Sequence, residues 1–382
     1  MFIHAGMILV VMAVAFAVAR LLKLTIELSM FAAAIAGALA HGAGIPVRHI
    51  VDGAFTYYDV CLIFITATFF MNLLKEAGGV TYIIRSIITT FHKQRFVCLL
   101  LLTLVLLVPG ALTGSGAVTV LIMGTLVGSV LTYMGISKTR TAAIIFLCAA
   151  MSAAAPPINL WAMMAAAGSN MPYVGFMQPL LIITVSGALL SMFILGWKGK
   201  AVDLEKALKE LPKPPEKMNL LRVIIPFLVF FVLVLAGRIW PFQMPILGLP
   251  LMFLISALAV FVISPKKLPV LEIASNTIRQ LIPLVGIMIV VGILIQIMAL
   301  SGARGLISLG VVTLPLTVLF ATLWLILPWS EGLVQYAAAP LLGIPLILLF
   351  NMKGLNPIIA LSAMAVMWPL GDCLPPTAVV GR

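Results

Sequence analysis

The stretch Pro109-Gly-Ala-Leu-Thr-Gly-Ser-Gly116 decides how this chain folds. It lies within a run of residues, Phe96 to Ile136, that contains no charged side chain. About 20 consecutive apolar residues suffice for one helical membrane crossing, so this run is longer than a single span needs. A proline and three glycines within eight residues predict that the helix unwinds inside the run.

The composition of the whole chain agrees with a membrane environment. Of its 382 residues, 63% are hydrophobic and only 9% are charged, and the mean hydropathy is +1.24. Soluble domains carry about 25% charged residues, and a globular core could not hide this much apolar surface. We therefore expect an all-α polytopic membrane protein. The net charge of +12 is then expected to mark cytoplasmic loops rather than a surface that binds nucleic acid.

A second helix breaker lies at Ala154-Ala-Pro-Pro-Ile-Asn159. Two adjacent prolines cannot continue a helix, so this segment predicts the tip of a re-entrant hairpin. Helix N-termini at such a tip would offer free N–H groups to an anion. Unwound backbone at membrane depth is tolerated where it lines a cavity. The freed carbonyls near Pro109, with the hydroxyls of Thr113 and Ser115, are oxygen ligands that suit sodium.

One strongly charged segment divides the chain. Residues 198–217 contain six lysines and four acidic residues and end in a proline-rich stretch. We interpret the segment as a cytoplasmic connector between a first half, residues 1–197, and a second half, residues 218–382.

Threonine, proline and glycine residues of the first half recur 219 positions later in the second half. A diproline, a single proline and two glycines coincide, which indicates an internal duplication. Lys93 and Arg95 precede the broken span of the first half, whereas Lys266 and Lys267 lie one span earlier in the second half. Equivalent spans would then run in opposite directions, as in an inverted repeat. The matching pairs are Thr103 with Thr322, Pro109 with Pro328, Gly124 with Gly343, Gly135 with Gly354, and Pro156-Pro157 with Pro375-Pro376.

The second half carries two acidic residues in apolar surroundings. Glu331 follows Pro328, and Asp372 precedes the second diproline; no other acid follows Glu272. An ionisable residue in a spanning segment is costly and marks a functional candidate. Either residue could bind a cation or relay a proton, and the alternative is that both lie at the membrane interface.

These segments resemble one known family. Pro109 to Gly116, Ala154 to Pro157, and Gly371 to Pro376 are similar to the large permease subunit of tripartite ATP-independent periplasmic (TRAP) transporters. The resemblance implies an elevator-type transporter with two re-entrant hairpins and broken helices. It also implies sodium-driven import of organic acids, together with a small membrane subunit and a soluble periplasmic binding protein. The chain departs from the family where Ser152 replaces a usual glycine and Glu331 a usual aspartate.

The pattern and the resemblance together give two groups of candidate site residues. Expected cation ligands are Thr113, Gly114, Ser115, Gly116, Ser330, Glu331, Gly332 and Asp372. Expected substrate-binding residues are Pro156, Pro157, Asn159, Gly371, Pro375, Pro376 and Thr377.

The expected function is sodium-coupled import of a small carboxylate across the cell inner membrane. We expect no catalytic activity and no cofactor, with sodium as the coupling ion, because the chain has no P-loop and no HExxH or GxSxG motif. One alternative is a proton- or sodium-coupled antiporter or exporter without a binding protein. A second alternative is an intramembrane enzyme, for which His49, Asp52 and Asp59 form the one cluster that resembles an active site.

Overall fold

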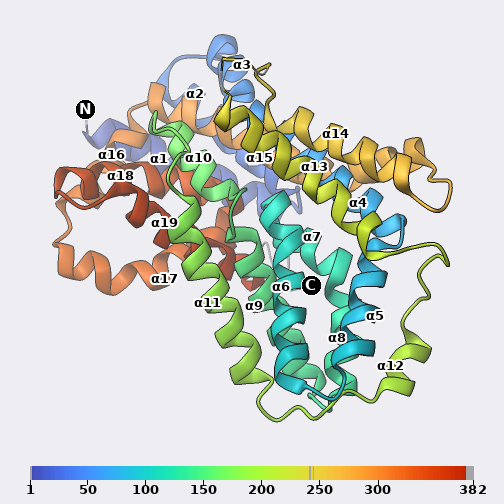
Figure 1. Cartoon of the computed structure of the whole chain (residues 1–382). Coiled ribbons are helices and arrows are strands. Elements are labelled where there is room, and N and C mark those ends of the chain that lie inside the picture. Colours follow the sequence, from blue (N-terminus) through green and yellow to red (C-terminus); the bar gives the residue numbers. More distant parts are fainter. Residues whose placement is uncertain (1, 241, 244, 376–382) are drawn as a thin grey trace. The chain divides into compact units, whose positions relative to one another are not determined.

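The computed structural model describes residues 2–240, 242–243 and 245–375 (Figure 1). Every regular element in these ranges is a helix, which confirms the prediction of an all-α protein. The chain divides into two compact units, and each unit takes segments from both predicted halves. The first unit comprises Met1–Cys61, Leu160–Leu180 and Leu281–Arg382, and the second comprises Leu62–Asn159 and Leu181–Gln280.

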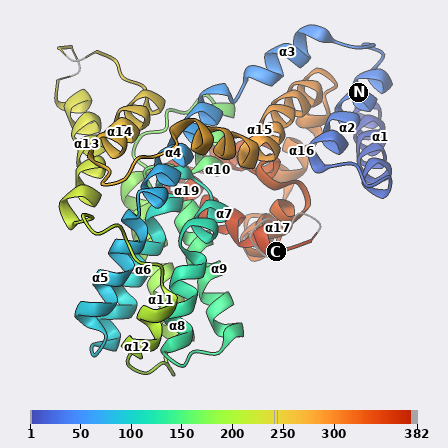
Figure 2. The same ribbon diagram turned by 90° about the vertical axis from the view of Figure 1, so that its right-hand side faces the viewer.

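The first unit is built around a helix pair at its N-terminal end. Helices α1 and α2 pack side by side (Figure 2), and Ile8 and Met12 of α1 join Ala34 and Ile297 in one buried cluster. Here η denotes 3-10 and π helices. The unit contains α1 (Phe2–Leu21), α2 (Ile26–His41), α3 (Val47–Phe55), α10 (Leu160–Gly168), α16 (Ala303–Thr313), α17 (Leu316–Val334), η2 (Gln335–Ala337), η3 (Ala339–Gly343), α18 (Ile344–Met352), α19 (Pro357–Met367) and η4 (Trp368–Cys373).

The second unit has an aromatic core. The Phe70 ring meets the Phe227 ring edge-on at 5.5 Å between centroids, and Phe230 stacks on Phe253 at 4.4 Å. Three helices, α4 (Tyr58–Glu76), α11 (Met177–Leu195) and α15 (Val270–Leu300), have residues in both units. The second unit also contains α5 (Gly79–Phe91), α6 (Arg95–Thr113), α7 (Gly116–Thr119), η1 (Val120–Gly124), α8 (Thr125–Tyr133), α9 (Lys138–Ala154), α12 (Leu204–Glu210), α13 (Leu220–Ile239) and α14 (Leu249–Ile263).

Eight helices in the described part of the chain are long and apolar enough to cross a membrane. Large apolar side chains cover their outer faces: Met7 and Val10 on α1 and Leu228 and Val232 on α13 are each more than half exposed. Lipid tails solvate such faces, whereas the backbone groups are satisfied within each helix. The chain is a multi-pass α-helical membrane protein.

The boundaries of several elements repeat along the chain. The π helices η1 and η3 start 219 residues apart, and α8 and α18, which follow them, have nine residues each. Gly135 and Gly354, after these helices, have φ angles of +77° and +73°. Helices α9 and α19 then start at Lys138 and Pro357, again 219 residues apart. The spacing detected between special residues thus extends to the local backbone conformation.

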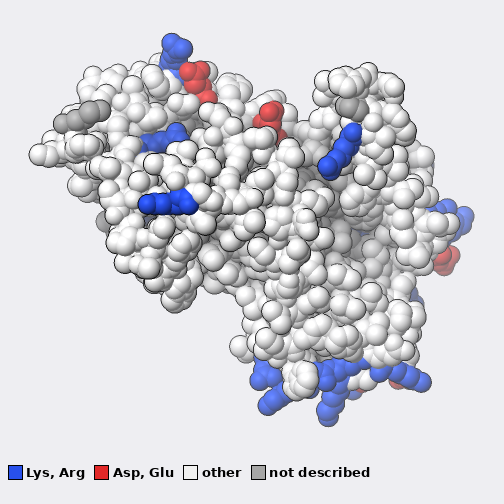
Figure 3. All heavy atoms as spheres, turned by 60° about the vertical axis from the view of Figure 1, so that its left-hand side comes forward, with Lys and Arg blue, Asp and Glu red and all other residues white. Residues whose placement is uncertain are grey.

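Basic residues gather at one end of the second unit, where α5, α6, α8 and α12 end or begin (Figure 3). Main-chain hydrogen bonds join the loops there, from Lys200 N to Met134 O at 2.6 Å and from Val202 N to His92 O at 3.1 Å. The predicted connector contains the short helix α12, as expected from its charged residues. Arg85 donates from Nη1 to the main-chain oxygens of Leu208 and Leu211 at 3.1 and 2.7 Å, so the connector is held against this unit.

Candidate functional site

The first break lies in the second unit and is shorter than predicted. Helix α6 continues through Pro109 and ends at Thr113. Gly114 adopts a φ of +70°, Ser115 is extended, and α7 begins at Gly116. The predicted break within Pro109–Gly116 is therefore confirmed, although only Gly114 and Ser115 leave the helical conformation and Pro109 stays inside the helix.

Ser152 explains why the helix survives Pro109. Its hydroxyl, fully buried on α9, accepts a hydrogen bond from Gly110 N at 2.9 Å and donates to Leu107 O at 3.0 Å. The same hydroxyl lies 2.7 Å from Thr119 Oγ1. A side chain from a neighbouring helix thus binds main-chain groups of α6 on both sides of Pro109, which is how proline is tolerated within membrane helices.

The contact between α6 and α9 requires glycine at position 110. A Cβ built there would overlap Ser152 Oγ and would lie 2.6 and 2.8 Å from the main-chain atoms Ser152 C and Ala153 N. Backbone atoms cannot move aside as a flexible side chain can. Gly110 therefore fixes how closely α9 approaches the first break.

The diproline segment lies against the same break. Helix α9 ends at Ala154 and α10 begins at Leu160, so the predicted interruption at Pro156 and Pro157 is confirmed. Ile158 N donates to Ala111 O of α6 at 3.0 Å, and Asn159 Nδ2 donates to Ala154 O at 2.9 Å. The structure brings the predicted cation segment and the predicted first hairpin tip together within one unit.

The hydroxyl of Thr113 is used inside its own helix. Thr113 Oγ1 donates to Pro109 O at 2.7 Å, which leaves the lone pairs of the hydroxyl oxygen as acceptors. Ser115 is 1% exposed, and Gly114 and Gly116 are buried beside it. This break therefore offers a cation main-chain and hydroxyl oxygens, the ligand type that hard cations prefer.

The second break lies in the first unit and also differs from its prediction. Helix α17 runs through Pro328 to Val334, so Ser330, Glu331 and Gly332 lie within its last turns rather than in unwound chain. Ser330 Oγ donates to Leu327 O at 2.7 Å, as expected inside a helix. The helix stops at Gln335, whose φ is +50°. This strained conformation of a non-glycine residue marks the actual break.

Glu331 is the most unusual side chain of the site. It has no exposed surface, and neither carboxylate oxygen has a hydrogen-bond partner among the described residues. The carboxyl group of Asp372, 6% exposed, lies close enough to act on it electrostatically. The indole N–H of Trp161 is also near Glu331, although the geometry falls short of a hydrogen bond. Two buried acids that have no cationic partner in the part of the chain that the structure describes favour the binding of a cation or a proton.

Four residues outside the predicted site, Trp161, Gln335, Tyr336 and Trp368, are buried in the same unit as Glu331. The Trp161 and Tyr336 rings lie 5.1 Å apart between centroids. Trp368 Nε1 and Gln335 Oε1 are buried and have no partner among the described residues. The sequence held one signal for these residues. Trp161 follows the first diproline, and Trp368 precedes the second.

Close backbone contacts hold η4 against α17. A Cβ at Gly371 would overlap Pro328 O and lie 2.8 Å from Glu331 Cβ, and a Cβ at Gly332 would lie 2.7 Å from Leu374 Cβ. Gly371 is thus a packing residue beside Glu331. Pro375 is the last residue that the structure describes, and Pro376 and Thr377 lie outside the described residues.

The cluster proposed for an enzyme lies at the surface. Arg48 Nε and Asp52 Oδ2 are 3.7 Å apart, and both side chains are more than half exposed. In the part of the chain that the structure describes, no three His, Cys, Asp or Glu side chains are grouped as metal ligands.

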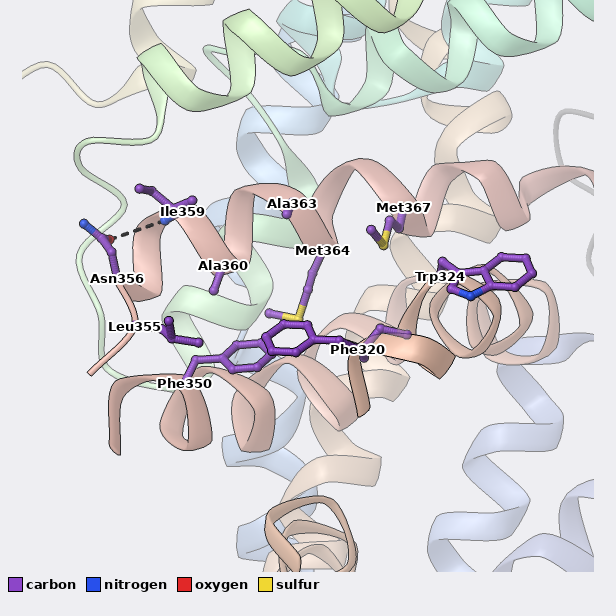
Figure 4. A pocket seen from close by; sticks show the side chains of 11 residues that line it. Phe320, Trp324, Phe350, Leu355, Asn356, Ile359, Ala360, Ala363, Met364 and Met367 are labelled. Atoms are coloured by element: carbon purple, nitrogen blue, oxygen red, sulfur yellow. Dashed lines mark hydrogen bonds between the residues drawn. The ribbon is translucent and has the colours of Figure 1, made fainter. Parts of the chain in front are cut away.

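An apolar cavity of about 430 Å³ lies in the first unit between α17, α18 and α19 (Figure 4). Its lining contains no ionisable residue, and Phe320, Trp324 and Met364 are among its walls. Asn356, its polar member, accepts hydrogen bonds from Ile358 N and Ile359 N and so caps α19. The cavity offers no ligand to an ion, and we place the candidate site at the two breaks instead.

The candidate site therefore comprises two clusters, one in each unit. No protein-family model and no curated protein matches this chain.

Proposed function

We propose that this protein is a secondary active transporter that imports a small organic acid with sodium as the coupling ion. The observation that carries the proposal is Glu331, a buried carboxylate near the end of a broken helix that has no hydrogen-bond partner among the described residues. A charge in this position costs several kcal/mol unless a counter-charge binds. A transported cation would supply that counter-charge in a reversible way.

The first break would hold a second cation through oxygen atoms that carry no formal charge. Thr113 and Ser115 lie at a helix end that is joined to the diproline segment by the Ile158–Ala111 hydrogen bond. A cation bound at a break would offset part of the desolvation cost of a carboxylate substrate bound beside it. Free N–H groups at the hairpin tips would bind the carboxylate itself.

The proposed architecture is an inverted repeat of the elevator type, with two re-entrant hairpins. The constant offset of 219 between η1 and η3 and between α9 and α19 supports a duplication. The basic end of the second unit would face the cytoplasm, following the excess of Lys and Arg in cytoplasmic loops. The membrane would be the cell inner membrane.

The proposed partners follow from the resemblance to TRAP permeases at Pro109–Gly116 and the two diprolines. They are a small membrane subunit and a soluble periplasmic binding protein that delivers the carboxylate. Within this proposal the chain is the large membrane subunit.

Uptake into membrane vesicles tests the proposal. Vesicles from cells that overproduce the chain with the proposed small membrane subunit would be given the binding protein and a panel of labelled mono- and dicarboxylates under an inward sodium gradient. We expect sodium-dependent uptake of at least one carboxylate, reduced to background by Glu331→Gln. Ser186→Ala, which changes an exposed hydroxyl on α11 that bonds its own helix, serves as the control. Uptake that ignores sodium and is unchanged in Glu331→Gln would contradict the proposal.

The alternative function is a proton-coupled antiporter or exporter without a binding protein. The proximity of two buried acids, Glu331 and Asp372, favours it, since carboxylates carry protons in many pumps. The same vesicles discriminate between the two functions. An imposed pH gradient in sodium-free buffer would drive transport by a proton-coupled exporter and leave a sodium symporter inactive.

A further inference from the structure

A groove of about 620 Å³ on the second unit has both polar and apolar residues in its lining. One wall contains Gly124, the last residue of η1, with Gly128 and Tyr133 of α8, and the other is α9, with Lys138 and Ile145. Glu210 of α12 completes the lining at one end. Figure 2 shows α8, α9 and α12 close together at the same end of the unit.

The polarity along α9 changes in one direction. Lys138, exposed at the start of the helix, is followed in the groove by the hydroxyl of Thr141 and then by the apolar Ile145. At 1.5 Å per residue, Thr141 lies about 4.5 Å and Ile145 about 10.5 Å from Lys138 along the helix axis. The polar layer of one leaflet is about 5–8 Å thick. With Lys138 at the level of the headgroups, the groove would extend to hydrocarbon depth.

The Thr141 hydroxyl is an independent sign that something occupies the groove. Thr141 is 6% exposed, and its Oγ1 has no hydrogen-bond partner among the described residues. Most helical Ser and Thr hydroxyls in this chain donate to the carbonyl four residues earlier, as Thr132 Oγ1 does to Gly128 O at 2.8 Å. A buried hydroxyl without a partner is costly. An acceptor that enters the groove would remove this cost.

The mouth of the groove carries one charge of each sign. Lys138 is the first residue of α9, and the N-cap Ser137 makes no side-chain hydrogen bond, so the first N–H groups of this helix are available to an anion. Across the mouth, the Glu210 carboxylate interacts with the Tyr133 hydroxyl. A single anion would meet Lys138 but also Glu210. A zwitterion would satisfy both.

We propose that this groove binds a phospholipid whose headgroup carries a phosphate and a primary ammonium, such as phosphatidylethanolamine. The phosphate would bind Lys138 and the start of α9, and the ammonium would donate to Glu210. The ester carbonyl of the glycerol would accept from Thr141, and an acyl chain would lie along Gly124, Gly128 and Ile145. This site is independent of the proposed transport function.

Native mass spectrometry of the purified chain in detergent tests the proposal. The protein would be mixed with phosphatidylethanolamine, phosphatidylcholine or phosphatidylglycerol of equal chain length, and the retained lipid would be counted. We expect retention of one phosphatidylethanolamine in preference to both others, because choline cannot donate a hydrogen bond and glycerol carries no charge for Glu210. Loss of a charge-assisted bond in Lys138→Ala should lower its occupancy about tenfold. Lys353→Ala, an exposed lysine of the first unit, is the matched control.

Two further variants keep the assignment falsifiable if Lys138→Ala is unstable. Glu210→Gln should remove the preference for phosphatidylethanolamine over phosphatidylglycerol while lipid retention persists. Ala142→Phe, which fills the groove from an exposed position, should abolish retention. Equal retention of all three lipids by the wild type, or unchanged retention in Ala142→Phe, would overturn the proposal. A change of oligomeric state in Ala142→Phe without loss of lipid would also overturn it, since the groove would then hold a helix.

Discussion

The two helix breaks follow prolines that lie 219 residues apart, Pro109 and Pro328. Their buried polar groups, however, are satisfied in different ways. At the first break, the Ser152 hydroxyl, Gly110 N and Leu107 O satisfy one another within the protein. At the second, Glu331 is fully buried and neither of its oxygens has a partner among the described residues. The first break is a completed hydrogen-bond network, whereas the second requires a ligand or a proton for completion.

This difference indicates where binding energy would be coupled to conformation. A network that is satisfied by the protein itself holds the same geometry with or without a ligand. A buried acid without a counter-charge changes its energetics strongly when a cation arrives. We therefore expect the first break to serve mainly as a rigid frame, and the second to respond most to ions.

The largest effects should come from the close backbone contacts that both breaks share. Gly110→Ala and Gly371→Ala would each place a methyl group on main-chain atoms of a neighbouring element. Overpacking of this kind costs about 3 kcal/mol, and we expect a large fall in the unfolding temperature in detergent for both variants. Gly237→Ala, a helical position with open space around it, should leave stability unchanged or raise it by up to about 1 kcal/mol. Equal behaviour of all three variants would show that the contacts are not tight.

Removal of the network at the first break should have the next largest effect. Ser152→Ala leaves Gly110 N and Leu107 O without their buried partner, at a cost of about 2 kcal/mol for the unsatisfied groups. Chemical denaturation of the detergent-solubilised variant would measure it. Ser191→Ala removes a half-buried hydroxyl that bonds only its own helix, and it should cost much less. A stable Ser152→Ala protein would remove the contrast between the two breaks.

A smaller effect is expected at the predicted first cation site. Thr113→Val removes one donor to Pro109 O and should cost about 1 kcal/mol, and Ser115→Ala should cost less. Both variants should stay folded and should show a weaker dependence of uptake on sodium. If sodium dependence survives both changes, the first cation site does not lie at residues 113–116.

The smallest effect concerns the connector, outside both breaks. Hydrogen bonds from Lys206 lower the pKa of Asp203, and Asp203 raises the pKa of Lys206. The contribution of Asp203 to helix α12 is therefore present above its ordinary pKa and is lost only as the pH falls through the lowered value. That of Lys206 is lost only as the pH rises above its ordinary pKa. Hydrogen exchange of the α12 amides, corrected for intrinsic rates, should show constant protection between about pH 5 and pH 9. Loss of protection at pH 5 would contradict the pairing.

Much of the fold could be predicted from the composition and from the helix-breaking prolines and glycines. The apolar content required a membrane, and the residues at an offset of 219 anticipated the matching positions of η1 and η3. The exact end of each broken helix could not be predicted. Pro109 does not unwind α6 because Ser152, 43 residues later, binds the main chain beside it. Local rules cannot anticipate a partner that distant in sequence.

At the second break, too, only some of the candidate site residues could be predicted from the sequence. Glu331 was predicted as a candidate from its sequence context, and its complete burial agrees with that choice. Trp161 belongs to the first half of the chain, and its place near Glu331 depends on packing within the first unit. The helix breaks at Gln335, whereas Gly332, an expected cation ligand, stays inside α17. A single polar residue in an apolar run gave no sign of which turn would break.

Thermal unfolding of purified wild type and Glu331→Gln, titrated with sodium chloride and with choline chloride at equal ionic strength, tests the central claim most directly. Ligand binding to the native state raises stability by about 2.7 kcal/mol at a hundredfold excess over Kd. We predict that sodium, but not choline, raises the unfolding temperature of the wild type to a plateau. Glu331→Gln should start higher in sodium-free buffer, because the buried charge is gone, and should lose most of the rise. A variant that starts lower and responds to sodium as the wild type does would contradict the account.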